Sequence, residues 1–334
     1  MPEAIRELQL DDPAALGDSL LRSSEPLLLR GLVRDWPAVR AGRESAAAAM
    51  RYLAGFYRGE PVVAWHGDAD IDGRFFYNSE FNGFNFRVER QRLDQVLDQI
   101  GACAEQHPSP AIYVGSTTVD SCLPGFRAGN DLDFGDRNPL ASIWIGNRSR
   151  IAAHHDVPDN LACVVAGRRR FTLFPPAQIG NLYVGPLDFT PAGQAISLVD
   201  FSEPDLTRFP RFAEALKHAR VAELEAGDAL LLPSMWWHHV EALEPFNVLL
   251  NYWWRQSPAY MDTPMNALML ALMIVRDLPA VERQAWQQMF DHYVFDADEH
   301  TAAHIPAHAR GVLATMDADA TRSLRARLLK RLNR

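Results

Sequence analysis

Short apolar or alternating runs follow one another closely through the middle of the chain. They read AIYVGS, ASIWIG, NLACVVAG, RRFTLFPP, DALLLPS, WWHHVEAL and NVLLNYWW, and Gly, Pro, Asn and Asp separate them. Strands this short at such close spacing are typical of an antiparallel sandwich or barrel. We therefore predict a mainly β fold, with a β core over residues 111–258.

The first 110 residues mix two periodicities. Apolar runs at residues 26–33 and 61–66 predict buried strands, whereas residues 46–57 and 88–100 carry apolar side chains at helical spacing. This mixture predicts an N-terminal α/β segment, residues 1–110, that packs on the β core.

Helical spacing returns near the C-terminus, at residues 266–277, 280–290 and 315–332. We predict a helical region over residues 259–334. Residues 265–275 are apolar on more than one face, which predicts burial on several sides. Burial under the β core and burial in a dimer interface are both open, and a homodimer formed through these helices is the expected assembly.

Composition and charge exclude some kinds of partner. The chain has 334 residues, 48% of them hydrophobic and 22% charged, which is typical of a globular protein. Its formal net charge of -9 argues against nucleic acid as a partner, because a phosphate backbone requires clustered Lys and Arg. The longest apolar run, residues 267–275, is too short to cross a bilayer, so no membrane partner is expected.

Cysteine usage and the N-terminal residues bear on the compartment. Three scattered cysteines form neither a disulfide framework nor a CxxC zinc site. The opening MPEAIRELQLDDPAA has early acids and no basic start followed by an apolar run, so it does not resemble a signal peptide. A cytoplasmic location is the expectation.

Candidate chemistry begins at residues 151–160, which read IAAHHDVPDN. Successive strand residues point to opposite faces, so His154 and Asp156 share one face and His155 points away. With a second imidazole from a distant strand, they would form the two-histidine, one-carboxylate set that leaves positions open on Fe(II). An H-x-D alone is common, and a hydrogen-bonded core histidine is its simpler interpretation.

The second imidazole is expected from the WWHHVEAL run. Alternation there separates Trp236 and His238 from Trp237 and His239. It does not choose which of the two sets faces inward, so His238 and His239 remain alternatives on this argument.

Five stretches in order resemble the Jumonji C, or cupin-like, family of Fe(II)- and 2-oxoglutarate-dependent oxygenases. They are IAAHHDVPDN, GRRRFTLFPP, VDFSEPDLTRFPRF, AGDALLLPSMWWHHVEAL and NVLLNYWW, within about residues 142–254. The most similar members are the asparaginyl hydroxylases that act on the hypoxia-inducible factor. The resemblance implies a double-stranded β-helix with Fe(II), 2-oxoglutarate as co-substrate and dioxygen. It places the metal ligands on His154, Asp156 and His238.

The same resemblance implies residues for 2-oxoglutarate. Arg169 stands where the family has a lysine that pairs with the distal carboxylate of the co-substrate, and an arginine can make that pair bidentate. Alternation places Arg169 on the opposite face from Arg168 and Arg170. The other residues that match co-substrate positions are Tyr113, Asn160 and Asn251.

One position departs from the family pattern. Ile151 stands where the family has a threonine that helps to hold the co-substrate, and isoleucine has no hydroxyl group. The resemblance implies a hydroxylase that acts on a protein or peptide side chain. A small-molecule hydroxylase and a metal-binding sensor without turnover are the alternatives. Three tryptophans are expected to line the pocket: Trp144, Trp236 and Trp253.

Overall fold

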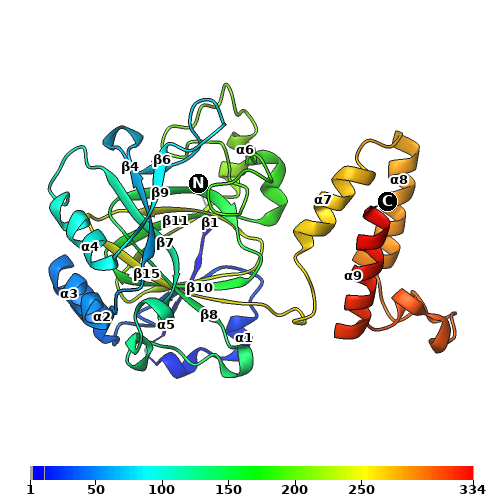
Figure 1. Cartoon of the computed structure of the whole chain (residues 1–334), viewed down its shortest axis with the longest axis horizontal. Coiled ribbons are helices and arrows are strands. Elements are labelled where there is room, and N and C mark those ends of the chain that lie inside the picture. The colour runs from blue at the N-terminus through cyan, green and yellow to red at the C-terminus, as the bar shows by residue number, and fades with distance from the viewer. Residues whose placement is uncertain (1–2, 11, 334) are drawn as a thin grey trace. The chain divides into compact units, whose positions relative to one another are not determined.

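The computed structural model describes residues 3–10 and 12–333 and divides into two units, Met1–Gln256 and Ser257–Arg334. The strands of the described residues all lie in the first unit, and the second unit is helical (Figure 1). The predicted division at residues 110 and 258 stays a prediction. Within the first unit, residues before 110 contribute strands to both sheets.

Two mainly antiparallel sheets form the first unit. Over the described residues, the smaller sheet has the order β1 (Glu3–Ala4), β12 (Arg220–Glu225), β11 (Arg168–Phe174), β14 (Trp237–Ala242), β9 (Ser149–His155) and β5 (Arg74–Phe75). The larger sheet has the order β2 (Arg6–Gln9), β3 (Leu27–Arg30), β13 (Ala229–Leu232), β10 (Asp159–Ala166), β15 (Asn247–Trp254), β8 (Leu140–Gly146), β7 (Ala111–Thr118), β4 (Val62–Gly67) and β6 (Phe86–Gln91). The predicted double-stranded β-helix, or jelly roll, is confirmed.

Apolar side chains from both sheets meet between them. Phe171 and Leu224 from the smaller sheet pack with Leu28, Val164 and Leu230 from the larger one. Every residue of β10 is buried, because this central strand is covered on both faces. The strand therefore gives a rigid support to the residues at its start.

Helices cover the outer face of the larger sheet. α2 (Pro37–Glu44), α3 (Ala46–Phe56) and α4 (Leu93–Ala102) pack on it, and the short helices α1 (Asp18–Leu21) and α5 (Val119–Cys122) lie in connecting segments. Helix α3 begins where the Ser45 hydroxyl accepts a hydrogen bond from the Ala48 amide, an N-cap. On the smaller sheet, α6 (Phe212–Lys217) packs through Phe212 against Phe174 and Trp237.

The prediction of one helix over residues 88–100 is wrong at its start. Residues 86–91 form the edge strand β6, which pairs with β4, and helix α4 follows. The helical spacing belongs to the buried residues Leu93, Val96, Leu97 and Ile100. Val88 is exposed on the edge strand and fitted that spacing only by coincidence.

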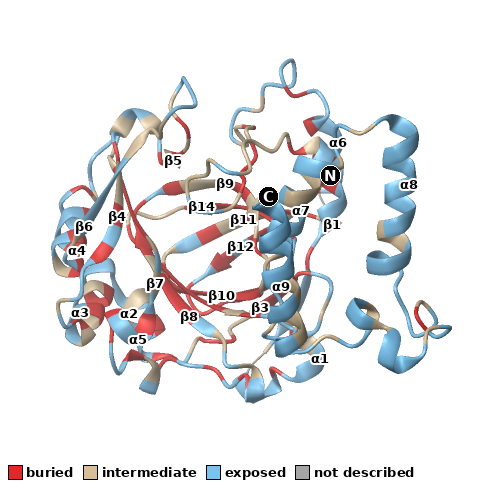
Figure 2. Cartoon of the chain, turned by 45° about the vertical axis from the view of Figure 1, so that its right-hand side comes forward, coloured by how far each residue is buried: buried red, intermediate tan, exposed pale blue. Residues whose placement is uncertain are grey.

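The second unit contains α7 (Pro264–Ile274), α8 (Ala280–Phe290) and α9 (Ala318–Leu332), so the predicted helical region is confirmed. No side chain of α7 is buried within the helical unit, and the predicted burial of residues 265–275 on several sides stays a prediction. Figure 2 shows α8 and α9 largely exposed as well. Over the described residues, none of the helices combines the length and the apolar character that crossing a bilayer requires.

Candidate metal centre and active site

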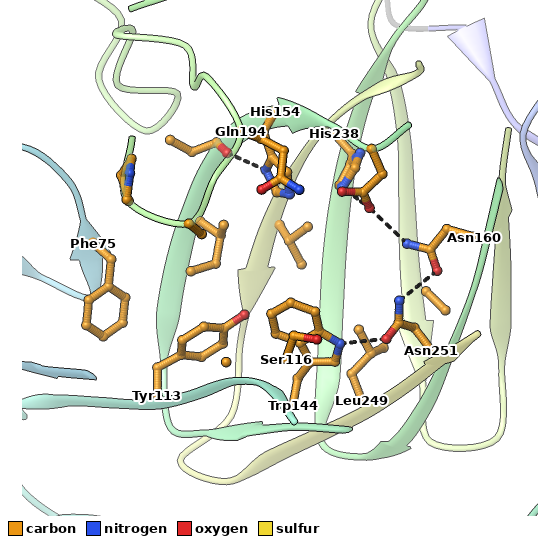
Figure 3. Close-up of a pocket in the computed structure, with 18 of the residues that line it drawn as sticks. Phe75, Tyr113, Ser116, Trp144, His154, Asn160, Gln194, His238, Leu249 and Asn251 are labelled. Carbon is orange, nitrogen blue, oxygen red and sulfur yellow. Dashed lines mark hydrogen bonds and ion pairs between the residues drawn. The ribbon is translucent and has the colours of Figure 1, made fainter. Parts of the chain in front are cut away.

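Two neighbouring strands of the smaller sheet bring two histidines together. His154 lies near the end of β9, and His238 lies opposite it in the antiparallel pair with β14. Asp156 follows β9 directly. One ligand atom from each of the three residues lies within 4.8 Å of the others, which is close enough to share one metal ion. Figure 3 shows both imidazoles pointing into the same cavity.

The backbone fixes the orientation of both imidazoles. His154 Nδ1 lies 2.9 Å from the Ala152 carbonyl oxygen, and His238 Nδ1 lies 3.0 Å from that of Trp236. In each case the carbonyl belongs to the residue two positions earlier and accepts a hydrogen bond from the Nδ1–H group. The Nε2 atom of each ring therefore keeps its lone pair for a metal, an arrangement typical of metal-binding histidines.

The Asp156 carboxylate is held by two neighbours. Its Oδ2 accepts hydrogen bonds from Trp253 Nε1 at 3.2 Å and from Asn160 Nδ2 at 3.4 Å. Its Oδ1 accepts no hydrogen bond from the residues that the structure describes. One oxygen is thus positioned by the protein, while the other is free to bind a metal.

Burial keeps His238 neutral. Desolvation, together with the nearby His154 imidazole, lowers the pKa of His238 to about 4, although the Asp156 carboxylate acts in the opposite direction. The 3.7 Å approach of His238 Nε2 to Asp156 Oδ2 is therefore not an ion pair at neutral pH. A neutral imidazole beside a carboxylate is the donor set that a divalent metal requires, so the three residues fit Fe(II).

The other member of each histidine pair faces away from these ligands. His155 packs against Trp237 with the ring centroids 4.6 Å apart. His239 packs against Phe201 at the same distance, and burial lowers its pKa to about 3. The structure thus brings His154, Asp156 and His238 together, which is the set that the resemblance implied.

A cavity of about 320 Å³ lies between the two sheets beside these ligands. Its walls include Tyr113, Asn160, Arg169 and Asn251, the four residues expected to bind the co-substrate. The structure gathers them around one space, from β7, β10, β11 and β15. Their individual roles toward 2-oxoglutarate stay predictions.

Arg169 is a buried cation without an acidic partner in the described part of the chain. It is 2% exposed, its Nε makes no hydrogen bond, and it forms no ion pair with any described residue. Burial lowers the pKa of its guanidinium to about 10, which leaves it charged at neutral pH. Arg168 and Arg170 instead face outward and pair with Glu244 and Glu223. Strand alternation therefore selected the inward arginine correctly.

A chain of hydrogen bonds connects the cavity wall to the metal-binding carboxylate. Trp144 Nε1 donates to Asn251 Oδ1 at 2.7 Å, and Asn251 Nδ2 donates to Asn160 Oδ1 at 3.2 Å. Asn160 in turn donates to Asp156, as described above. Burial raises the pKa of the Tyr113 hydroxyl, so this group stays protonated and can donate a hydrogen bond to a bound anion.

The cavity wall also contains the position that departs from the family pattern. Ile151 lies in the cavity wall, where it packs against the cluster that contains Phe75 and Tyr113, and its side chain offers no hydrogen bond. Trp144 and Trp253 also line the cavity, but Trp236 does not, so that prediction is wrong. β14 begins at Trp237, so strand alternation does not extend to Trp236. Its Nε1 donates instead to the Ser24 carbonyl oxygen at 3.1 Å.

The sequence argument missed several wall residues. Gln194 comes from the long connection between β11 and β12 and lies in the cavity wall. It makes no hydrogen bond to another residue of the described chain. Phe75, from the two-residue strand β5, and Trp65 complete the apolar wall. A loop glutamine carries no periodicity, so no signal in the sequence could have identified it.

Comparison with known proteins finds relatives that carry different names. The chain is 35% identical over 140 residues to the lysine-specific demethylase JMJ31 of Arabidopsis thaliana, which is 39% of this chain and 25% of that protein. It is 38% identical over 106 residues to the tRNA wybutosine-synthesizing protein 5 of Gallus gallus, 32% of this chain and 30% of the relative. It is 35% identical over 127 residues to the human HSPB1-associated protein 1, and these residues cover 37% of this chain and 25% of that protein.

These matches span only about a quarter to a third of the relatives' length. The finer likeness to the asparaginyl hydroxylases stays a prediction. The model of the cupin-like domain, by contrast, matches residues 13–260, which include every strand from β3 to β15 and all three metal-binding residues. The chain therefore belongs to the family of cupin-like domain proteins.

Proposed function

We propose that the chain is an Fe(II)- and 2-oxoglutarate-dependent hydroxylase that acts on a protein or peptide side chain. One observation carries this proposal: a single cavity holds both the His154, Asp156 and His238 ligand set and the guanidinium of Arg169, which forms no ion pair with any residue in the described ranges. A buried charge without a partner is costly, and a dicarboxylate that also reaches the metal would neutralise it.

Each group of the cavity has a task in this proposal. The two Nε2 atoms and one Asp156 oxygen hold the metal on one side, which leaves its other positions open. Arg169 pairs with the distal carboxylate of 2-oxoglutarate, and the Tyr113 hydroxyl donates a hydrogen bond to it. With 2-oxoglutarate and dioxygen bound, the iron would supply oxidation of a C–H bond to an alcohol, coupled to decarboxylation of the co-substrate.

The walls of the cavity serve orientation and exclusion of water. Trp65, Phe75 and Ile151 present apolar surface toward the metal-binding residues. They limit water near the reacting groups and so suppress side reactions. The Gln194 carboxamide, in the same cavity wall, offers both a donor and an acceptor. This favours a substrate with an amide group, as a peptide or an amide side chain has.

The test begins without oxygen. Adding 2-oxoglutarate to the anaerobic Fe(II) protein should produce a metal-to-ligand charge-transfer absorption band, and Asp156→Ala should abolish it. Asp159→Asn, a change three residues away at a carboxylate outside the cavity, should keep it. A protein with Asp156→Ala that retained the band and full oxygen consumption would refute the proposal.

A second candidate function is a metal-binding sensor that does not turn over. Ile151 favours it, because this position offers no hydroxyl group to the co-substrate. The same titration separates the two functions. Metal binding without the band, or a band without oxygen uptake in the presence of peptide substrates, would favour the sensor.

A further inference from the structure

Five aromatic side chains gather beside the wall of the cavity and form what we call the aromatic rim: Phe76, Tyr77, Phe81, Phe84 and Phe189. Four belong to the connection between β5 and β6, and Phe189 belongs to the connection between β11 and β12. The Tyr77 hydroxyl donates to the Phe189 carbonyl oxygen at 2.6 Å and ties the two connections together.

The aromatic rim is continuous with the cavity wall. Phe189 stacks on Phe84 with a centroid distance of 5.0 Å, Phe84 on Phe86 at 5.2 Å, and Phe86 on Trp65 at 4.5 Å. Trp65 itself lines the cavity. A molecule that lay on the rim could therefore extend into the cavity without crossing a polar gap.

Phe81 is held in an unusual conformation. Its φ of 55° lies in the left-handed region, which bulky residues rarely adopt. The residue is 36% exposed, and its ring stacks on that of Tyr77 with the centroids 5.0 Å apart. Hydrogen bonds between Asn78 and Asn82 stabilise the turn around it. Such strain persists only where the surrounding structure imposes it, and it is frequent at ligand-binding sites.

The charge around the aromatic rim is negative. Glu80 accepts a hydrogen bond only from Asn82, and neither it nor Asp188 forms an ion pair with the residues that the structure describes. Asp188 lies close enough to Tyr77 to help burial raise the pKa of that hydroxyl. Both carboxylates are exposed and free to attract a cation.

The arginines near the aromatic rim are already paired with carboxylates. Arg74 lies 3.5 Å from Asp200, and Arg150 lies 3.1 Å from both Asp72 and Asp200. Arg87 lies 3.5 Å from Asp68. These pairs leave the carboxylates of Glu80 and Asp188 uncompensated.

The rim also carries one cation–π contact of its own. The Arg74 guanidinium lies 3.8 Å from the ring centroid of Phe76. Aromatic faces attract cations, and the attraction adds to that of nearby carboxylates. A phosphate backbone would instead be repelled by Glu80 and Asp188.

We propose that the aromatic rim docks a positively charged polypeptide segment, rich in arginine or lysine, that flanks the reacting residue of the substrate. That the segment belongs to a substrate rests on the proposed function. Binding of the cationic segment itself does not.

The experiment measures binding to the full chain by fluorescence anisotropy. The probes are a labelled peptide of alternating arginine and glycine, a glutamate and glycine peptide of the same length, and a short single-stranded RNA. The arginine peptide should bind, more tightly at low ionic strength, and the other two should not. Binding of RNA in preference to the arginine peptide, or equal binding of the two peptides, would overturn the proposal.

Variants locate the binding surface. Phe81→Ala should weaken binding of the arginine peptide about threefold to fivefold. The pair Glu80→Gln and Asp188→Asn should weaken it about tenfold and flatten its salt dependence. The matched control removes two exposed carboxylates elsewhere, Asp98→Asn with Glu105→Gln, and should leave binding unchanged. An equal loss in the control pair would contradict the assignment to the rim.

The failures of the two proposals are distinguishable. The charge-transfer band is recorded on the same variants, which lie outside the metal-binding and co-substrate residues. Retention of the band with no peptide binding overturns the docking proposal alone. Peptide binding in a protein that never shows the band overturns the proposed hydroxylase and leaves the docking surface in place.

Discussion

Arg168 and Arg169 are neighbours on β11 in opposite environments. Arg168 faces outward and pairs with Glu244, whereas Arg169 is buried at the cavity and has no carboxylate partner among the residues that the structure describes. Taking a charge out of water costs free energy unless a partner compensates it, so the two guanidinium groups should contribute to stability with opposite sign.

Arg169→Met should stabilise the ligand-free protein by about 1–2 kcal/mol, because it removes an uncompensated buried charge and keeps much of the volume. It should also abolish the stabilisation that 2-oxoglutarate gives to the metal-loaded protein. Chemical denaturation with and without 2-oxoglutarate measures both effects. Arg168→Met is the control and should change the unfolding free energy by less than about 1 kcal/mol. A large loss of ligand-free stability in Arg169→Met would show that the charge is compensated.

The two histidine doublets give a second comparison at this scale. His238→Ala removes an Nε2 that faces Asp156 and should reduce metal affinity by more than the roughly 10–100-fold typical of an outer-shell change. His239→Ala removes a ring that packs on Phe201 and should retain the metal. Metal content after gel filtration, measured by atomic emission, decides between them. Metal loss in His239→Ala alone would reverse the assignment.

Single residues differ in how far the sequence predicts them. The period of two separates His154 from His155 and Arg169 from Arg168, because each pair lies within a strand whose two faces meet different environments. The same rule does not reach Trp236, which precedes β14. The sequence does not predict Gln194 as a wall residue, because its position depends on the path of a long connection and on no repeating pattern.

A single glycine joins β10 to β11 and so places Arg169. Gly167 has a φ of 75°, and a Cβ there would lie 2.3 Å from the Asn247 side-chain oxygen and 2.6 Å from the Phe246 carbonyl oxygen. Only glycine allows both the left-handed backbone and this close approach.

Gly167→Ala should therefore lower the unfolding free energy by about 2–4 kcal/mol and weaken 2-oxoglutarate binding, since β11 would shift. Gly193→Ala is the matched control. It has a φ of 93° but nothing within 4 Å of the added Cβ, so it should cost only about 1 kcal/mol. Urea denaturation gives both values. Equal losses would show that backbone strain, and not the close approach, determines the cost.

Elements were predictable where the apolar pattern was strong. The strands of the β core were expected from short runs between turn residues, and α8 was expected at the residues where it lies. The edge strand β6 was mistaken for the start of a helix, because an edge strand buries little and its polar sequence lacks a clear period. β5 is only two residues long and carries no period at all.

The whole chain includes a helical unit that exposes much apolar surface. Met273 is 66% exposed and Phe295 is 74% exposed, and Ile274 and Trp286 are also exposed. Apolar patches on this scale typically mark interaction sites. The predicted homodimer through these helices is consistent with that surface and stays a prediction.

A prediction for the whole molecule concerns formation of the homodimer. Met273→Glu with Ile274→Glu should weaken the dimer at least about tenfold, because each change places a charge on an apolar interface. Sedimentation equilibrium over a range of concentrations measures the dissociation constant. Val88→Glu, a similar change at an exposed position of β6, should leave it unaltered. An unsubstituted chain that is monomeric at every concentration contradicts the prediction.

The hydrogen bonds from the two Nδ1 atoms to backbone carbonyls have a consequence for metal uptake. They select one tautomer of each imidazole before any metal arrives, so the orientation of the ligands is largely complete in the folded apoprotein. Because the pKa of His238 is about 4, protons should not compete with the metal at this ligand until the pH falls close to that value. Metal uptake near neutral pH should then release almost no protons from His238, so any dependence of the heat of an isothermal titration on the ionisation enthalpy of the buffer should arise at other groups.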